Sequence, residues 1–543
     1  MKALLLYPCF PQTFWSYDRF MEMANLKAFI PPLGIITVAA LLPQDWEIRF
    51  YDRNVNPETD ADWDWCDLVI LSAMLAQRDD FHHLIRKAVQ AGKKVAVGGP
   101  YPTSIPQDAI ASGAQYLILD EGELTVPMFL EALQAESHAQ ESVLEPSPSE
   151  PSPKIFRASE KPDVTLSPMP RFDLLNINEY LMMAIQFSRG CPFNCEFCDI
   201  ITLYGRKPRT KNPEQALAEL QTLYDLGWRG SVLIVDDNFI GNQRNVKRFL
   251  RELIPWMRSH NYPFTFLTEA SVNLAEDAEM LDLMAQAGFY GVFLGIETPD
   301  QDSLEVTHKY QNTRHSLAEA CNTITKAGLL IYAGFIIGFD GERDGAGDRI
   351  QAFVEETSIP QPMLGVLQAL PNTALWTRLD QEQRLFQTIH GALEVGDQNT
   401  LMNFTPTRPI GDIAKEYLTA LWTMYEPANY LKRCFQHCLE ITPNPRLQQN
   451  MHFPPGKGLR LMSQLLWLQG IRRPGIRKQF WRQLWVILTQ KPQFLNVYLG
   501  LCATGEHFLE YRAIARERIS QQLGYDPLTS SEVASEPSSL VHV

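Results

Sequence analysis

The chain has 543 residues and a formal net charge of −15, and 45% of its residues are hydrophobic. This length is sufficient for several domains with cores of their own. The acidic balance argues against general nucleic-acid binding, which normally needs a basic surface. The nine cysteines show no paired extracellular pattern, and the apolar run after Lys2 is too short for a signal peptide, so we expect a cytoplasmic protein.

Residues 1–134 alternate short apolar runs with helical patterns, which predicts a doubly wound, Rossmann-like α/β domain. Such a domain binds its ligand at the carboxyl ends of the strands. The expected strands are Lys2–Tyr7, Glu47–Tyr51, Leu68–Ser72, Lys94–Val97 and Tyr116–Leu119, and the expected helices are Gly34–Leu42, Phe81–Ala91 and Leu124–Leu133.

Turn residues gather at these predicted strand ends, where glycine would let the backbone approach a large ligand closely. By itself such a domain could hold a nucleotide or a flavin, or act as a phosphoprotein switch. The candidate ligand-binding residues are Gly34, Asp52, Ser72, Gly98, Gly99, Glu121 and Gly122.

Residues 135–160 are dominated by Pro, Ser and Glu and lose apolar periodicity, which predicts a flexible linker. A repeated strand–helix pattern follows over residues 161–361 and predicts a whole or partial (β/α) barrel, with active residues at the strand ends. The expected strands are Met183–Ser188, Gly230–Val235, Phe264–Glu269, Gly291–Gly295 and Leu330–Gly338, and the expected helices are Pro213–Leu226, Asn245–His260, Ala275–Ala287 and Leu317–Ala327.

Three cysteines, Cys191, Cys195 and Cys198, stand in a C-x3-C-x2-C spacing within R-G-C-P-F-N-C-E-F-C. Thiolates this close in sequence can bind one metal centre, and three of them leave one iron of a [4Fe–4S] cube open. Phe197 would shield the cluster from water. The alternatives are a structural zinc site, which lacks a nearby fourth ligand, or unrelated cysteines. Arg189 either steadies the anionic thiolates or caps the preceding turn.

Polar residues follow several predicted barrel strands: Asp236, Asp237, Asn238, Glu269, Ser271, Asn273 and Glu297. Each one alone could cap a helix or lie in a solvated turn. Their recurrence at successive strand ends favours a binding site.

Residues 362–525 are predicted to form a helical region, and residues 526–543 a disordered tail. Cys434 and Cys438 lie one turn apart and could join a second cluster or simply pack as small hydrophobes. Between Lys457 and Lys491, basic residues alternate with Trp and Leu and no acid occurs. Such helices either contact an anionic membrane surface or pack on the barrel with a solvated basic face. The expected helices are Ile410–Met424, Asn429–Cys438, Gly458–Gln469, Arg477–Leu488 and Gln493–Arg518.

The run C-P-F-N-C-E-F-C resembles the signature of the radical S-adenosylmethionine (SAM) superfamily, in which SAM chelates the open iron. The upstream domain resembles the cobalamin-binding domains of B12-dependent radical SAM enzymes. The turn from Asp52 to Pro57 lacks the histidine of the D-x-H-x-x-G motif, as in many members, which implies cobalamin without a lower histidine ligand. The alternative is a degenerate domain that no longer binds cobalamin.

The resemblance also implies roles for the strand-end residues. Asp236, Asp237 and Asn238 occupy the position of the motif that binds the SAM amino group. Glu269, Ser271 and Asn273 match the ribose and carboxylate positions, and Glu297 is a further strand-end acid. The run from Gly334 to Gly338, G-F-I-I-G, resembles the strand that pairs with adenine.

With its helical C-terminal extension, the chain resembles a subgroup related to the hopanoid methylases. This resemblance implies methylation of an unactivated carbon in a small-molecule or lipid substrate, through a 5′-deoxyadenosyl radical and methylcobalamin. It also implies an electron donor such as flavodoxin or ferredoxin. Two alternatives remain: a cobalamin-assisted radical rearrangement or cyclisation without methyl transfer, and a sensor or scaffold that has lost turnover.

Overall fold

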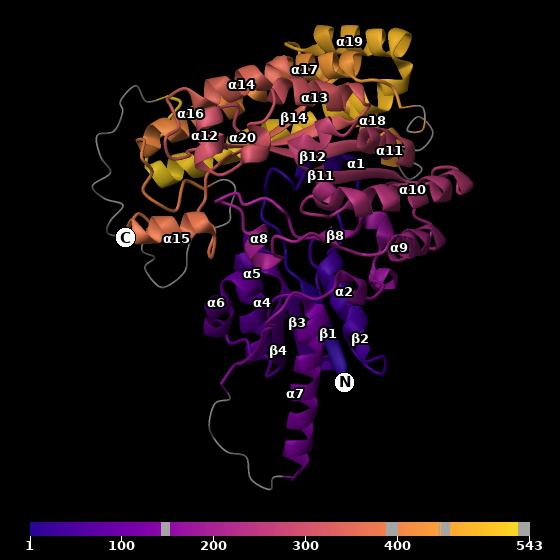
Figure 1. Cartoon of the computed structure of the whole chain (residues 1–543), viewed down its shortest axis with the longest axis vertical. Coiled ribbons are helices and arrows are strands. Elements are labelled where there is room, and N and C mark those ends of the chain that lie inside the picture. Colours follow the sequence, from indigo (N-terminus) through magenta and orange to yellow (C-terminus); the bar gives the residue numbers. More distant parts are fainter. Residues whose placement is uncertain (143–151, 387–399, 445, 447–456, 530–543) are drawn as a thin grey trace.

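The computed structural model describes residues 1–142, 152–386, 400–444, 446 and 457–529. An N-terminal domain on one parallel sheet lies below a half-barrel of six parallel strands, and C-terminal helices cover the half-barrel (Figure 1). None of the described helices is long and apolar enough to cross a membrane. The three-part fold class expected from the sequence is confirmed.

The N-terminal sheet has the strand order β2-β1-β3-β4-β5-β6, and all its pairs are parallel. Successive residues of β1 point to opposite faces. Leu5 packs under α2 and α7, whereas Leu4 and Leu6 pack under the helices of the other face, α3 to α6. The strands are β1 Lys2–Tyr7, β2 Glu47–Asp52, β3 Leu68–Ser72, β4 Lys94–Gly98, β5 Tyr116–Ile118 and β6 Lys154–Phe156. The helices are α2 Leu33–Leu41, α3 Asp60–Trp65, α4 Arg78–Gln90, α5 Pro100–Ser104, α6 Pro106–Ala111 and α7 Gly122–Ser142.

The predicted linker over residues 135–160 is wrong at both ends. Helix α7 continues to Ser142, and β6 adds a sixth strand beside β5. The sequence hid both because the end of α7 is polar and β6 is a three-residue edge strand with exposed side chains. Residues 143–151 lie outside the described part of the chain.

The connection between β1 and α2 leaves the N-terminal domain and enters the half-barrel region. Phe14 stacks on Phe508 with ring centroids 4.6 Å apart, and Trp15 meets Phe293 edge-on at 5.3 Å. Helix α1, Asp18–Ala24, packs against α20. The predicted boundary near residue 134 therefore does not separate two independent cores.

The same connection covers an open edge of the half-barrel. The backbone N–H of Leu181 donates to the carbonyl of Ala28, and that of Met182 to the carbonyl of Phe29, each at a distance of 3.0 Å. Residues 28–29 thus lie beside β7, the edge strand, and satisfy backbone groups that an open sheet would expose.

The half-barrel has the order β14-β13-β12-β11-β10-β7. Its last strand, β14, was not predicted and extends the core past Gln361. Pro362 obscured it, since proline cannot donate a ladder hydrogen bond and is tolerated only in edge strands such as this one. The strands are β7 Met182–Ile185, β10 Ser231–Ile234, β11 Thr265–Ala270, β12 Phe289–Glu297, β13 Leu330–Ile337 and β14 Gln361–Val366. The helices are α9 Pro213–Asp225, α10 Gln243–Ser259, α11 Ala278–Ala287, α12 Gln301–Val306, α13 Leu317–Lys326 and α14 Ala346–Glu356.

Helices α16 to α20 agree with the predicted ones to within about five residues, with a π-helical turn, η8, inserted after α18, whereas α15 was not predicted. The predicted disordered tail begins too early: Asp526 accepts from Arg516, and the described chain runs to Thr529, whereas residues 530–543 lie outside it. The bounds are α15 Ala374–Gln381, α16 Ile410–Met424, α17 Pro427–Glu440, α18 Lys457–Trp467, η8 Leu468–Arg472, α19 Arg477–Gln490 and α20 Leu495–Leu523.

Cys434 and Cys438 on α17 face a third thiol, Cys502 on α20, and all three are fully buried. Burial raises the pKa of Cys434 to about 12, so its thiol stays protonated. Fully buried and protonated, these cysteines pack as small hydrophobes.

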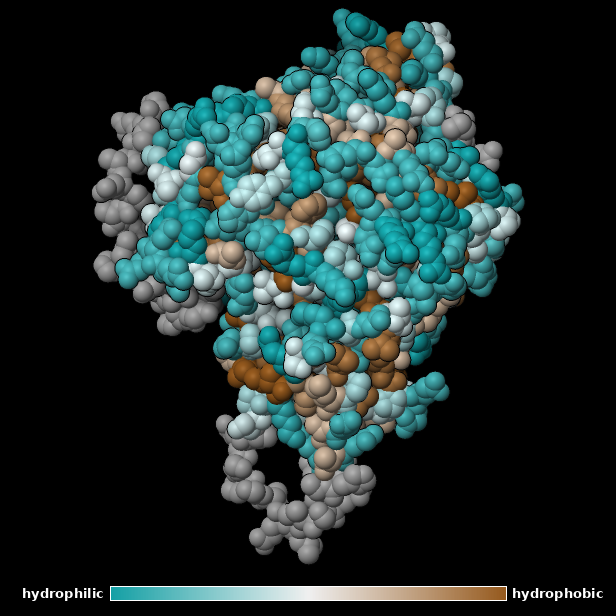
Figure 2. Space-filling view, viewed as in Figure 1, coloured by the Kyte–Doolittle hydropathy of each residue, from teal (hydrophilic) through white to brown (hydrophobic). Residues whose placement is uncertain are grey.

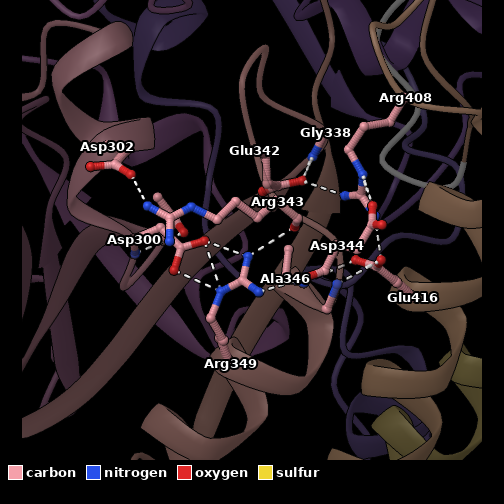
Figure 3. A network of polar contacts seen from close by, with 12 residues as sticks. Asp300, Asp302, Gly338, Glu342, Arg343, Asp344, Ala346, Arg349, Arg408 and Glu416 are labelled. Atoms are coloured by element: carbon pink, nitrogen blue, oxygen red, sulfur yellow. Dashed lines mark hydrogen bonds and ion pairs between the residues drawn. The ribbon is translucent and has the colours of Figure 1, made fainter.

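A network of ion pairs joins the end of β13 to the C-terminal helices (Figure 3). The backbone N–H of Gly338 donates to Glu342 over 2.9 Å. Arg408 contacts Glu342 at 3.2 Å and also pairs with Asp344 and Glu416. Burial raises the pKa of Glu342 to about 7. The positive charge of Arg408 acts in the opposite direction, but burial has the larger effect.

We predict that this carboxyl makes stability depend on pH. The folded state holds the proton that an unfolded glutamate loses near pH 4, so stability falls by roughly 2–4 kcal/mol as pH rises from about 4 to about 7. Glu342→Gln removes this loss. As pH rises from about 5 to about 8, the unfolding midpoint of the variant should therefore increase relative to that of the wild type.

Differential scanning fluorimetry across this range provides the measurement. Glu356→Gln, at the exposed end of α14, is the matched control and should keep the pH dependence of the wild type. A pH-independent difference between Glu342→Gln and the wild type would contradict the prediction.

Candidate functional site

The three cysteines lie on a loop closed by a two-stranded antiparallel pair, β8 Ser188–Arg189 and β9 Arg209–Thr210. Gly190 precedes the first cysteine with φ of 92°, in the left-handed region. A Cβ at Gly190 would lie 2.8 Å from the carbonyl oxygen of Gly205. Only glycine fits this position, because a side chain would push the two sides of the loop apart.

The thiols of this loop have the environment that an iron–sulfur cluster needs. The amide of Asn238 donates to the Cys191 sulfur at 3.8 Å, and that of Gln311 donates to the Cys195 sulfur at 3.6 Å. N–H groups aimed at the ligand sulfurs stabilise thiolate charge and tune the cluster. The loop therefore fits a [4Fe–4S] cluster.

Burial, and then the neighbouring acid and thiols, raise the pKa of Cys198 far above its ordinary value. A zinc site needs at least three His, Cys, Asp or Glu side chains close enough to bind one ion, and the described residues contain no such group. A four-iron cube holds its ligands farther apart than one ion does.

Asp236 and Asp237 follow β10 but have different environments. Asp236 is fully buried and accepts from the Phe187 N–H at 2.8 Å and the Ser188 hydroxyl at 2.7 Å. Asp237 is partly exposed and accepts from the Gly190 N–H, at 3.1 Å, through one carboxylate oxygen, so the other remains for a ligand. Burial raises the pKa of Asp236 to about 6 and that of Asp237 to about 7, the latter with a contribution from Asp236.

Glu269 belongs to the same acidic group. Its side chain is solvent-exposed, yet desolvation, followed by Asp237 and Asp236, raises its pKa to about 8. The carboxyl is thus open to solvent on one side and close to the other two acids. A cationic ligand beside these acids would be attracted by the deprotonated carboxylates.

A cavity of about 400 Å³ lies between the cysteine loop and the ends of β10 and β11. Three predicted residues, Asn238, Ser271 and Asn273, line it beside Pro192 and Phe193 of the loop. The Ser271 hydroxyl donates to Asn273 at 2.5 Å, and the Asn238 amide donates to Ser271 at 3.2 Å. These polar groups form one connected wall.

Two buried residues near the cysteines were missed from the sequence. Lys309 pairs with Glu297, lies 5.8 Å from the ring centre of Phe197, and is 7% exposed. Gln311 contacts the Cys195 sulfur, as described above. Both occur in the polar run T-H-K-Y-Q-N, residues 307–312. A polar run of this kind is typical of an exposed loop, so the sequence did not indicate that these two side chains are buried. Glu297 is therefore engaged by an ion pair and has φ of 66°.

The glycines of the G-F-I-I-G run make close contacts. A Cβ at Gly334 would lie 3.0 Å from Phe293, and one at Gly338, where φ is 103°, would lie 2.6 Å from Met402. Their assignment to adenine remains a prediction.

Of the seven candidates in the N-terminal domain, Asp52 and Glu121 are engaged by protein groups. Asp52 is buried and accepts from Asn54 and, at 3.0 Å, from the hydroxyl of Tyr180. Glu121 is held by two arginines. The sequence could not show this, because Tyr180 and the two arginines lie outside the N-terminal domain.

The other five candidates are Gly34, Ser72, Gly98, Gly99 and Gly122. Gly99 has φ of 93°, and a Cβ there would lie 2.6 Å from the Ser72 hydroxyl, so the turns after β3 and β4 pack closely. Gly34 faces open space. Phe10 and Met74 follow β1 and β3 and remain 38% and 49% exposed. An apolar, glycine-bordered surface at the switch point between β1 and β3 fits a large corrin ring.

A buried ion-pair cluster joins the N-terminal domain to the cysteine loop. Arg189 contacts Glu121 and Glu123, each at 2.8 Å, and Arg209 contacts Glu121 at 2.7 Å. The two glutamate side chains are only 2% and 3% exposed. Burial alone would raise the pKa of Glu123, but the bonds from Arg189 lower it. Arg189 thus points toward the N-terminal domain.

Comparisons with known proteins agree with this architecture. Family models for a B12 binding domain, the radical SAM superfamily and a domain of unknown function match residues 22–130, 185–353 and 373–521. An uncharacterised methyltransferase of Synechocystis sp. is 53% identical over 96% of this chain and 94% of its own length. The hopanoid C-2 methylase of Rhodopseudomonas palustris is 32% identical over 89% of this chain and 88% of its own length.

The cobalamin-dependent SAM radical enzyme OxsB, solved with aqua-cobalamin, shares the fold with a TM-score of 0.59 and 14% identity, over 97% of this chain and 82% of its own. A cobalamin-type domain joined to a radical SAM half-barrel defines the class of B12-dependent radical SAM enzymes. The chain belongs to this family, in the group that contains the hopanoid C-2 methylase. Its cofactors are a [4Fe–4S] cluster, SAM and cobalamin.

We predict that Arg189→Met destabilises the protein by about 3–5 kcal/mol, because it leaves the buried carboxylate of Glu123 without its arginine and Glu121 with Arg209 alone. Iron bound per chain after reconstitution should fall as well, since the loop loses its anchor. Thermal unfolding and iron content measure both effects.

The control is Arg248→Met, which breaks two ion pairs, with Glu214 and Glu252, of an arginine whose side chain is 61% exposed. It should cost less than about 1 kcal/mol and leave iron content unchanged. Equal effects of the two substitutions would show that the buried cluster does not hold the loop.

Proposed function

We propose that the protein transfers a methyl group from SAM to an unactivated carbon of a small-molecule or lipid substrate. The observation that carries the proposal is the 32% identity to the hopanoid C-2 methylase, which extends over the N-terminal domain, the half-barrel and the helical extension. A radical rearrangement without methyl transfer is less favoured, because both curated relatives described above are named as methyl-transfer enzymes.

Cys191, Cys195 and Cys198 would hold the cluster, with the amides of Asn238 and Gln311 supporting two of the sulfurs. The bound cofactors supply the radical and methyl-transfer chemistry. Phe197, whose ring centre lies 5.8 Å from that of Phe339, would keep water from the cluster. The chain itself orients the partners and excludes solvent.

For SAM, we propose that Asp237 is the acid that accepts from the amino group, because Asp236 already accepts two hydrogen bonds. Glu269 lies close to both acids and would attract the cationic end of the molecule. Ser271 and Asn273, on the cavity wall, offer hydroxyl and amide groups to the ribose and carboxylate. The backbone between Gly334 and Gly338 would pair with adenine, and Glu297 would act through Lys309.

For cobalamin, we propose contacts with the backbone at Gly34, Gly98, Gly99 and Gly122 and with Ser72. Asp52 and Glu121 would support these turns without touching the cofactor. The turn after Asp52 contains no histidine, so the cobalt would have no lower histidine ligand from it.

A lipid is the substrate class we favour, since the relative is named for a hopanoid. A lipid substrate would bring the enzyme to one side of a membrane. The cluster needs a single-electron donor, and we propose a flavodoxin or ferredoxin for that role.

The first test is cofactor content. After anaerobic purification from cells supplied with hydroxocobalamin, we expect about four irons and about one cobalamin per chain. Four irons without cobalamin would overturn the methyl-transfer mechanism and leave the N-terminal domain as a substrate or docking module.

With reductant, SAM and lipid extract, S-adenosylhomocysteine should form beside 5′-deoxyadenosine, and label from methyl-labelled SAM should enter a lipid. Formation of 5′-deoxyadenosine alone would favour rearrangement. No SAM cleavage at all would favour a sensor or scaffold.

We predict that Asp237→Asn weakens SAM binding by on the order of tenfold, the loss expected for one charge-assisted hydrogen bond. Equilibrium dialysis of the reconstituted protein measures this, with iron content as the check on the loop. The control is Asp225→Asn, at the exposed end of α9, which should bind SAM as the wild type does. Unchanged binding by Asp237→Asn would remove Asp237 from the site.

A further inference from the structure

The helical hairpin made of α18, η8 and α19 has two different faces. Its inner face packs on the protein through Leu461 and Leu465 of α18 and Phe480, Leu484 and Ile487 of α19, all at most 7% exposed. Neighbours of the hairpin are α1, α17 and α20. The sequence left two alternatives for this segment, packing on the protein and contact with a membrane. Packing explains the inner face but not the outer one.

The outer face carries large apolar side chains that the described residues leave uncovered. Trp481, Trp485 and Leu488 recur at helical spacing along α19, and Trp485 is 68% exposed. Figure 2 shows apolar side chains reaching the surface at the top of the molecule, in the region of α19. We call this surface, formed by η8 and α19, the outer face; its apolar residues are Ile471, Trp481, Trp485 and Leu488.

The two halves of the outer face are fixed to each other. The Trp481 indole N–H donates to the Gly470 carbonyl at 2.9 Å. A Cβ at Gly470 would lie 2.8 Å from the Trp481 ring, so the π-helical turn and α19 are in close contact. The exposed side chains of η8 and α19 therefore form one surface and not two separate patches.

Charge on this face is opposite to that of the whole chain. No Asp or Glu occurs between Lys457 and Lys491, while the chain carries −15 overall. Arg473 is used internally, in a pair with Glu506 at 2.6 Å. Four others are exposed and make no side-chain hydrogen bond or ion pair with the described residues: Arg472, Arg477, Lys478 and Arg482.

We infer that the outer face docks the enzyme on an anionic lipid surface, with the tryptophans at the headgroup level and these four exposed basic side chains at the lipid phosphates. Tryptophan prefers the interface because its ring is apolar and its N–H is polar. Basic side chains beside an apolar stripe are attracted to anionic lipids. A basic patch of this kind on an acidic protein also sets the orientation, because the rest of the surface is repelled.

The inference rests on the proposal that the substrate is a lipid. Its test measures binding to vesicles and not methyl transfer, so the membrane contact and the proposed reaction can each be disproved separately. The probe is flotation with vesicles of phosphatidylcholine alone or mixed in equal amounts with phosphatidylglycerol. The reconstituted full chain should float with the mixed vesicles and not with neutral ones, and added salt should release it.

The paired variant Arg477→Glu/Arg482→Glu should lower partitioning by at least about tenfold, because four units of charge change at the lipid surface. Trp485→Ser/Leu488→Ser should lower it by about fivefold while keeping the charge. The matched control, Arg86→Glu/Lys415→Glu, makes the same change in net charge at exposed positions of α4 and α16 and should stay within about twofold of the wild type.

SAM cleavage with soluble reductant should be equal in all these variants, which confirms that they are folded. If a variant fails to fold, the lipid and salt dependence of the wild type still decides. No flotation with mixed vesicles, or equal losses in the outer-face and control variants, would overturn the inference and leave the outer face to a protein partner.

Discussion

The cysteine loop depends on a buried ion-pair cluster that it shares with another domain. Arg189 and Arg209 lie on the two short strands that close the loop, and both reach Glu121 at the carboxyl end of the N-terminal sheet. Buried charges cost free energy unless every one is paired, so this joint holds one relative position of loop and sheet. Since strand ends of the sheet bind the cofactor in such domains, the joint fixes the distance between the two cofactor sites.

A second constraint comes from the chain's first connection. Phe14 and Trp15 leave the N-terminal domain to pack against α20 and β12, and residues 28–29 cover the edge strand β7. The half-barrel is thus closed on one side by a segment that belongs, in sequence, to the other domain. The N-terminal domain cannot swing freely as a unit on a linker, and any movement between the domains must carry this aromatic segment with it.

Local patterns were sufficient to predict most elements and the nature of the site. Alternating apolar runs gave the buried strands, and the cysteine spacing indicated an open cluster. The errors have physical causes. Pro362 hid the edge strand β14, and the short β6 lacked apolar content. The long connection between β1 and α2, residues 8–32, could have been recognised, since βα loops in such domains rarely exceed six or so residues. Pairings such as Glu121 with Arg189, 68 residues apart, leave no trace in a single sequence.

Three acids at the ends of β10 and β11, Asp236, Asp237 and Glu269, lie close enough together to influence one another's charge. Burial raises the pKa of Asp236, Asp237 and Glu269, and the charge of Asp236 adds to the effect at the other two. An enclosed group of like charges is unfavourable in the empty protein, where some of them hold protons near neutral pH. A ligand that brings a sulfonium and an ammonium would offset that repulsion, and its binding would release those protons. If these acids bind SAM as proposed, the groups that repel one another in the empty protein would favour a cationic cofactor over a neutral or anionic one.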